Sequence, residues 1–504
     1  MAHEKFKSRG GFILASVGAA IGLGDSLRFP GLCAKYGGGT FLFIYIIALV
    51  LIGIPVLNAE IALGRKFRGG APKCMASLNR KAEPFGWASC FNSLVVAFLY
   101  AAILGWIAVM LIKIIPLCKA AQTSTQAQTS AYFFEKVLGG GAVSPIILGC
   151  IIAAWVVMFL CLRGGAKSLA ATAKFTVIIP VVLLLFLAGR GLIYNNSGEA
   201  LRALFVPDFS AFGNAELWLN ALGQVFFSLS VMVGIMPAYG AYLPDGTFIF
   251  KDALIIAAAD FFVSILSSVV LFTTLYGCGL KDLISQSGIA TAFAVYPVAI
   301  TLCFGAENVA LNCIVGILFY ASLAMMALQS SVSMVEAVVG PLADKFKTNK
   351  KKLAAVVCAT GAAVCTVFAT PFAAMALDLC DHFANYFNIL LLGIAESIVI
   401  GRAAKKINLA GEINRYSGKL TMPVKPFVFS VKYLCPVALA VLFAWGVYHL
   451  IFAERGLYAG YPLWAQAVFG WAVSLTVFAS GFVIGFLFKK RQKSLAVKLK
   501  NATM

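Results

Sequence analysis

The stretch from Gly18 to Pro30 holds the residues whose types and spacing are best suited to chemistry. It places three glycines, Asp25, Arg28 and Pro30 inside an apolar run that begins at Gly11. Glycine weakens a helix, and proline removes a backbone donor and clashes with the preceding turn. In a bilayer, freed backbone groups persist only where they line a cavity or are buried in protein, and an ionisable residue there marks a functional site. The stretch therefore predicts a broken helix that holds a small ligand or ion near mid-membrane.

The elements that position this stretch are membrane-spanning helices. The 504 residues are 61% hydrophobic and 12% charged, with a mean hydropathy of +0.92, too little charge for the surface of a water-soluble domain. Apolar runs of about 20 residues, each long enough to cross a bilayer, recur along the chain. We expect an all-α polytopic membrane protein, one transporter domain over 1–504. The twelve expected helices lie at about 10–35, 40–65, 87–116, 144–162 and 167–194, then 216–243, 251–278, 307–343, 353–371 and 378–401, and finally 427–453 and 463–488.

The net charge of +20 is a topology signal and not a nucleic-acid surface. Lys and Arg gather in alternate loops, which is the positive-inside pattern, and this predicts a cell-membrane protein with both termini in the cytoplasm. The basic clusters lie around residues 5–9, 65–68, 80–81, 163–167, 345–352, 402–406 and 489–500. The cysteines fall mostly inside apolar runs and show no ligand spacing, so we expect no metal cluster and no catalytic set.

A second span is interrupted as well. The segment from Gln224 to Gly234 is polar and glycine-containing at its centre, and Pro237 and Pro244 follow. Corresponding breaks in two halves of a transporter mark its binding site, because half-helix ends and unwound carbonyls face the ligand and the ions.

These residues resemble the neurotransmitter:sodium symporter family. The resemblance rests on Gly22-Leu23-Gly24, Arg28-Phe29-Pro30, Gly37-Gly38-Gly39, Gly53-Ile54-Pro55, Glu60-Ile61-Ala62-Leu63-Gly64-Arg65, Val206-Pro207-Asp208-Phe209, the run 223–230, Ser330-Ser331 and Glu396. It implies the LeuT fold, an inverted repeat of five plus five helices (about 10–194 and 216–401) followed by two further helices at about 427–488. It also implies ion-coupled uptake of a small amino acid or amine.

Carried over by position, the resemblance implies a substrate pocket between the first, third, sixth and eighth helices. Its residues would be Ala20, Gly22, Gly24, Asp25, Tyr100, Phe227, Ser230, Met232, Val233, Ser330 and Met334. Tyr100 would bind a substrate carboxylate and Phe227 would cover the site. Arg28 with Asp381 would form the outer gate. Asp344 would form the inner gate with a basic partner in the tail, at the position of His3 and close to Lys5 and Lys7.

The ion sites depart from the family pattern. The first sodium site, formed by Ala20, Asp25, Ser228 and Asp260, has aspartates where the family has two asparagines. Two carboxylates in a low dielectric cannot both stay ionised without cations. Asp25 and Asp260 thus require a sodium with a second positive charge, a divalent ion, or a proton. The second charge could be the ammonium of a substrate that lacks a carboxylate.

The chloride site and the second sodium site change too. Tyr45, Gln224, Ser228 and Ser264 resemble a chloride site, but Asp260 would supply the negative charge itself, so we expect chloride-independent transport. The second sodium site would comprise Gly18, Ile21, Met326, Gln329 and Ser330. The glutamine stands where the family has a threonine. It could bind sodium through its oxygen or fill the site with its NH₂, and both interpretations stay open.

The sequence thus predicts a secondary active symporter that works by alternating access, with sodium as the expected coupling ion. The alternatives are a proton-coupled or cation transporter on the same fold, or a substrate sensor or channel. We expect a small-molecule substrate, a lipid bilayer as surroundings, sodium as the ion, no organic cofactor and no nucleic acid.

Overall fold

The computed structural model describes residues 5–139, 143–194, 196–280, 291–453 and 457–501, with residues 487–501 described by backbone alone. Within these ranges the regular elements are helices, which confirms the all-α class. Ten helical segments are long and apolar enough to cross a membrane, and the bent pair Arg9–Ala20 and Gly24–Lys35 makes an eleventh. The expected span at 216–243 is divided into α11 (Ala215–Ser228) and α12 (Ile235–Ala241), so the arrangement is compatible with twelve.

The spans of the first half follow the expected ranges closely. They are α1 (Arg9–Ala20), η1 (Gly24–Arg28) and α2 (Phe29–Lys35); α3 (Gly38–Ala48), η2 (Leu49–Gly53) and α4 (Ile54–Phe67); α6 (Glu83–Ala120); α8 (Pro145–Leu162); and α9 (Gly165–Gly191). Short helices lie between them: α5 (Ala71–Leu78), η3 (Arg80–Ala82), α7 (Gln126–Tyr132), η4 (Phe133–Leu138), α10 (Ser197–Phe205) and η5 (Phe209–Gly213).

The second half repeats this pattern after α11 and α12. Its spans are α13 (Ile249–Gly277), α16 (Val309–Phe346), α17 (Lys350–Val364) with η8 (Cys365–Ala369), and α18 (Ala373–His382) with η9 (Phe383–Asn388) and α19 (Ile389–Ala403). The last two spans are α21 (Val424–Phe429), η10 (Ser430–Leu434), α22 (Cys435–Tyr448) and η11 (His449–Ala453), then α23 (Leu463–Gln466), η13 (Ala467–Trp471) and α24 (Ala472–Asn501). The connecting elements are η7 (Thr291–Val295), α15 (Tyr296–Leu302), α20 (Leu409–Asn414) and η12 (Tyr458–Gly460).

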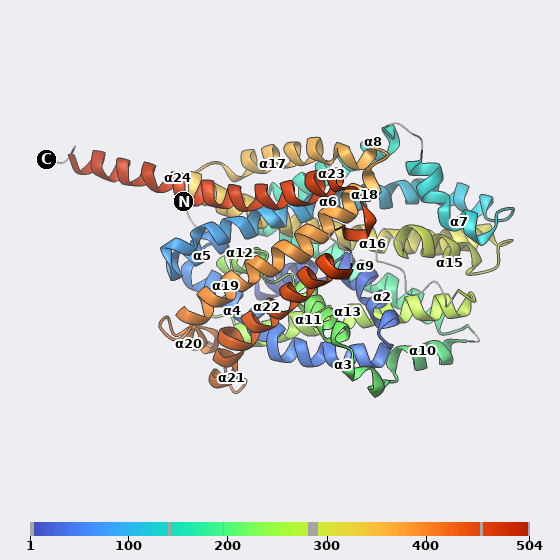
Figure 1. Ribbon diagram of the computed structural model, residues 1–504, viewed down its shortest axis with the longest axis horizontal. Coiled ribbons are helices and arrows are strands. Elements are labelled where there is room, and N and C mark those ends of the chain that lie inside the picture. Colours follow the sequence, from blue (N-terminus) through green and yellow to red (C-terminus); the bar gives the residue numbers. More distant parts are fainter. Residues whose placement is uncertain (1–4, 140–142, 195, 281–290, 454–456, 502–504) are drawn as a thin grey trace.

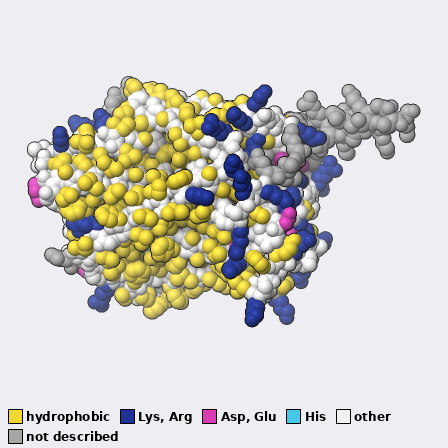
Figure 2. Space-filling view, turned by 180° about the vertical axis from the view of Figure 1, so that it is seen from behind, with side chains coloured by type: hydrophobic (Ala, Val, Ile, Leu, Met, Phe, Trp, Pro, Cys, Tyr) yellow, Lys and Arg dark blue, Asp and Glu magenta, His cyan; other side chains and the backbone are white. Residues whose placement is uncertain are grey.

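The long helices run side by side, with α5, α20 and α21 at one end of the bundle and α7, α10 and α15 at the other (Figure 1). On the face shown in Figure 2 a broad hydrophobic band covers the middle of the molecule, and Lys and Arg side chains gather mainly beyond one edge of it. This distribution is typical of a bundle that spans a bilayer with unequal charge on its two sides.

The first break follows from one side chain. Helix α1 ends at Ala20, and Ile21 is extended with ψ 110°. In a continued helix the N–H of Gly22 would donate to the carbonyl of Gly18. It donates instead to Oδ2 of Asp25 at 2.9 Å. Asp25 therefore takes a backbone hydrogen bond out of the helix and holds the break in place.

The second break uses three residues in the left-handed region. Ser230, Met232 and Gly234 have φ values of 49°, 63° and 76°, which costs a non-glycine residue about 1–2 kcal/mol. The N–H of Met232 donates to Oε1 of Glu60 at 2.9 Å, and Glu60 is buried in α4. A hydrogen bond to a buried acid offsets the cost of this turn.

Helix α12 lies backbone against backbone on α4. A Cβ on Gly64 would lie 2.1 Å from the carbonyl oxygen of Pro237, and one on Gly240 would lie 2.4 Å from that of Ile61. Only glycine permits this approach. The inner half of the second broken span is thereby fixed to α4.

Candidate functional site

Asp25 is the centre of a buried polar cluster where the first helix breaks. Its Oδ2 accepts from the Gly22 N–H, and its Oδ1 accepts from the hydroxyls of Ser228 at 2.7 Å and Ser264 at 2.9 Å. The side chain is 1% exposed. Residues from η1, α11 and α13 therefore converge on one carboxylate.

Asp260 completes the cluster from α13. Its Oδ2 contacts the same Ser228 hydroxyl, its Oδ1 has no hydrogen-bond partner, and the residue is fully buried. A serine hydroxyl has one proton and can donate it to one oxygen at a time. The contact of Ser228 with two carboxylates thus requires a proton or a cation in addition to the protons that Ser228 and Ser264 supply.

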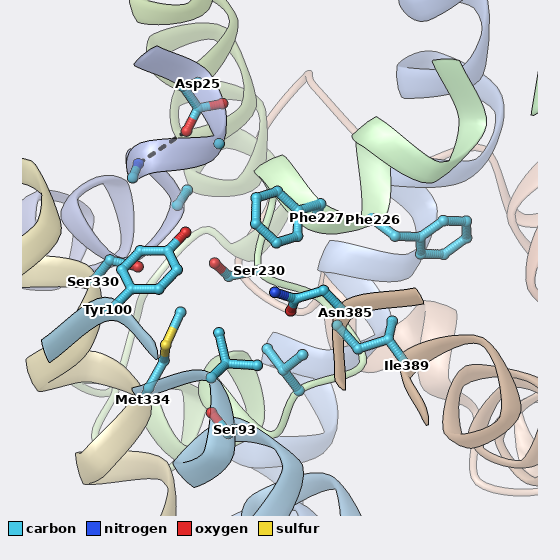
Figure 3. Close-up of a pocket in the computed structure, with 15 residues that line it drawn as sticks. Asp25, Ser93, Tyr100, Phe226, Phe227, Ser230, Ser330, Met334, Asn385 and Ile389 are labelled. Atoms are coloured by element: carbon cyan, nitrogen blue, oxygen red, sulfur yellow. Dashed lines mark hydrogen bonds between the residues drawn. The ribbon is translucent and has the colours of Figure 1, made fainter. Parts of the chain in front are cut away.

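A small cavity adjoins this cluster. Tyr100 and Ser330 lie on one side of it, Asn385 and Ile389 on the other, and Ser230 between them (Figure 3). Its volume is about 20 Å³, room for a single water. Phe227 lies directly over Gly24, where an added Cβ would be 2.2 Å from the ring. The side chains that line the cavity therefore leave almost no room for a substrate in this conformation.

The structure brings the residues expected to bind substrate into the wall of this cavity, with one exception. The residues that line it are Ala20, Gly22, Gly24, Asp25, Tyr100, Phe227, Ser230, Val233, Ser330 and Met334. Met232, whose backbone is left-handed, is not among them: a Cβ added to Gly393 on α19 would lie 3.6 Å from its Cγ, so its side chain lies beside α19. An added Cβ on Gly22 would lie 3.3 Å from both the Tyr100 and the Ser330 oxygen, so glycine leaves room there for a ligand.

Five further residues that sequence reasoning missed also line the cavity, namely Ser93, Val96, Phe226, Asn385 and Ile389. The Oγ of Ser93 and the Oδ1 of Asn385 are buried without a hydrogen-bond partner. Spacing could have identified Ser93, because it lies seven residues before Tyr100 and so on the same helix face. Asn385 likewise follows Asp381 by four residues.

A vestibule of about 460 Å³ lies above the cavity. Arg28 and Asp381, the expected outer gate, both line it, but Arg28 stacks on the Phe227 ring at 5.3 Å and Asp381 accepts from Asn385 at 2.7 Å. Among the ion pairs of the described residues, none joins Arg28 to Asp381. The vestibule is thus separated from the cavity by Phe227 while the gate charges remain apart.

The opposite end is closed by the N-terminal tail. Lys5 pairs with Asp245 at 2.7 Å, Arg9 bonds Asp252 at 2.7 Å, and the buried Phe6 ring packs edge-on against two tyrosines of the α12 region. Lys5 beside it holds the pKa of Asp245 below its ordinary value. Asp344 is exposed at the end of α16, and His3 lies outside the described residues. The described tail therefore closes this end through Asp245 and Asp252.

The expected second sodium site is assembled around the end of α1. Ser330 Oγ lies 3.5 Å from the carbonyl of Ala19, and Met326 accepts from Ser26 through its sulfur at 3.3 Å. Gln329 is fully buried against Gly18, and its Oε1 accepts from Thr176 at 2.9 Å. The side chain expected to be a ligand is thus bonded to α9 through its oxygen.

Comparisons with known proteins agree with this geometry. The profile of the Sodium:neurotransmitter symporter family matches residues 3–117 and 120–490. A sodium-dependent transporter of Methanocaldococcus jannaschii is 32% identical over 412 residues, which cover 79% of this chain and 82% of that protein. The sodium-dependent neutral amino acid transporter B(0)AT2 of Rattus norvegicus is 23% identical, covering 91% and 76%. The crystal structure of MhsT in complex with L-phenylalanine has a TM-score of 0.75 at 26% identity, covering 88% of this chain and 99% of that one. The chain belongs to the Sodium:neurotransmitter symporter family.

Proposed function

We propose that this protein is a sodium-coupled symporter that carries a small amino acid or amine by alternating access. One observation carries the proposal: the helix break places Asp25 both in the wall of the cavity and in contact with the Ser228 hydroxyl, which also contacts Asp260. An ion bound at Asp25 therefore contacts the same backbone turn that receives the substrate, which is the physical requirement for coupling.

Sodium would bind among oxygen atoms of Asp25, Ser228 and Asp260, with the Ala20 carbonyl as a further ligand. Hard cations prefer such carboxylate, hydroxyl and carbonyl oxygens. Two carboxylates leave one negative charge beyond a single sodium. A substrate ammonium in the cavity would lie next to Asp25 and balance it, and an amine without a carboxylate would balance it in full.

The wall of the cavity supports a substrate with a compact side chain. Tyr100 and the backbone at Gly22 and Gly24 provide hydrogen-bonding groups for a carboxylate, and Val96, Val233, Met334 and Ile389 provide an apolar surface. The similar proteins support an amino acid as the substrate class: one is named a neutral amino acid transporter and another was solved with phenylalanine.

Transport is proposed to be independent of chloride. Ser228 and Ser264, two residues of the chloride-like site, donate to Asp25, so a carboxylate already receives the hydroxyls that would bind an anion. A chloride beside Asp25 and Asp260 would be repelled in this buried setting.

The protein is proposed to lie in the cell membrane with both termini in the cytoplasm. The tail pairs with Asp245 at the end where the basic residues Arg65 and Arg68 lie, which is the end that the positive-inside rule assigns to the cytoplasm.

Flux into proteoliposomes tests the function. An inward sodium gradient should drive concentrative uptake of an amino acid or amine, selected by thermal stabilisation of the purified protein across a ligand panel. Uptake driven by an acid-outside gradient without sodium would establish the proton-coupled alternative. Flux that never exceeds equilibrium under any gradient would indicate a channel, and binding without flux would indicate a sensor.

A further inference from the structure

The break in α1 leaves a backbone carbonyl without its helical partner. The N–H of Gly22 donates to Asp25, so the carbonyl oxygen of Gly18 receives no donor from the next turn. The last carbonyls of a helix also carry its partial negative charge. The family resemblance places a second sodium at this helix end, and a cation there would satisfy the freed carbonyl.

Gln329 of α16 occupies this position. A Cβ added to Gly18 would lie 2.5 Å from Cγ of Gln329 and 3.3 Å from its Cδ, so the stem and the amide carbon lie directly against the helix end. The residue is 0% exposed. Its side chain fills the space beside Gly18.

The amide presents its donor and not its acceptor. Its Oε1 lies 2.9 Å from the Thr176 hydroxyl, which also lies 3.0 Å from the carbonyl of Thr172, and its Nε2 is buried without any partner. A buried NH₂ without an acceptor is costly, by about 1–3 kcal/mol. The carbonyl of Val17 accepts from the Ile21 N–H and that of Ala19 from the Ser230 hydroxyl, so the Gly18 carbonyl is the acceptor of this helix end that has lost its donor. This unpaired carbonyl and the unpaired NH₂ are complementary.

A sodium ion and an amide NH₂ exclude each other at the same carbonyls. Sodium needs oxygen ligands, whereas the NH₂ offers hydrogens that repel a cation. A threonine hydroxyl, the residue type that the family has here, would leave the space open and supply an oxygen.

We propose that the Gln329 amide permanently replaces the second sodium, so that this transporter couples one sodium ion to each substrate molecule. The inference rests on the proposed function. Its consequence is energetic, because each coupled sodium multiplies the attainable accumulation by the sodium gradient. A tenfold gradient then supports roughly tenfold accumulation of a neutral substrate, instead of roughly a hundredfold with two ions.

The test is the number of sodium ions bound by the full-length protein in lipid nanodiscs, measured with ²²Na⁺ at saturating substrate. We expect one ion per transporter and a Hill coefficient near one for sodium-dependent substrate binding. In Gln329→Thr the count should rise to two. Gln122→Thr makes the same exchange on an exposed residue and should leave the count at one.

Two bound ions in the unaltered protein, falling to one in Gln329→Leu, would overturn the inference and make the Gln329 oxygen a sodium ligand. The count in the unaltered protein decides this even if a variant fails to fold. A protein that binds no sodium would refute the proposed function itself, so the two failures are distinguishable.

Discussion

Asp25→Asn gives the sharpest test of the ion site. The carboxylate accepts three hydrogen bonds, from the Gly22 N–H on one oxygen and from two serine hydroxyls on the other. An asparagine keeps only one oxygen. If that oxygen faces the hydroxyls, its NH₂ confronts the Gly22 N–H, donor against donor. If the amide is reversed, the hydroxyls lose their acceptor.

Either orientation loses at least one hydrogen bond to a charged acceptor, worth about 1.5–3 kcal/mol. Because about 1.4 kcal/mol corresponds to a factor of ten, the sodium concentration for half-maximal substrate binding should rise about 10- to 150-fold. The break that presents the ion ligands is also less well held, which acts in the same direction.

The assay is a sodium titration of substrate-induced thermal stabilisation, with choline as the replacing cation. Asp208→Asn, the same exchange on an exposed outer residue, serves as the control and should match the unaltered protein. An Asp25→Asn protein that binds substrate with sodium dependence within about twofold of the control would refute the role of Asp25.

Three further predictions follow from the walls and the ends of the site. Ser93→Ala and Asn385→Ala each remove an unpaired polar atom, so thermal stabilisation by valine should increase relative to threonine, and equal changes for both ligands would contradict this. Replacing chloride by gluconate at constant sodium should leave uptake unchanged, because the serine hydroxyls already donate to Asp25, and a loss of uptake would show that chloride is required. Arg9→Ala leaves the Asp252 carboxylate buried without its partner at a cost of about 1–3 kcal/mol, so residues 5–12 should exchange amide hydrogens faster. Unchanged exchange would show that the Arg9–Asp252 pair does not hold the tail in place.

Much of the architecture could be predicted because its signals are local. Apolar runs define the spans, and glycine and proline at residues 18–30 and 224–237 mark both breaks. Motif spacing also identified ten of the fifteen residues that line the cavity. One sequence is enough to detect these signals, because each helix in lipid satisfies its own backbone hydrogen bonds and so depends on its own residues.

The remainder depends on side-chain direction and on partners distant in sequence. Met232 is adjacent to cavity residues but points away, because its φ of 63° rotates the side chain, and no propensity predicts that angle for methionine. The pairing of the tail with Asp245 and Asp252 depends on loop geometry. The orientation of the Gln329 amide depends on Thr176, 153 positions earlier.

The glycine contacts between α4 and α12 have a mechanical consequence. With Gly64 and Gly240 pressed against opposing carbonyls, the two helices cannot slide or tilt past each other without a steric clash. Helix α11 meets the same span at Gly53, where an added Cβ would lie 2.6 Å from the Val225 side chain and not from backbone. Motion of α4 and α12 together therefore reaches α11 through residues 229–234 as well as through this side-chain contact. That short turn, held by Glu60, connects the α4–α12 pair to the helix that carries Phe227. A Gly240→Ala exchange would therefore disturb the packing of α12 on α4 and leave every ligand-contacting atom unaltered.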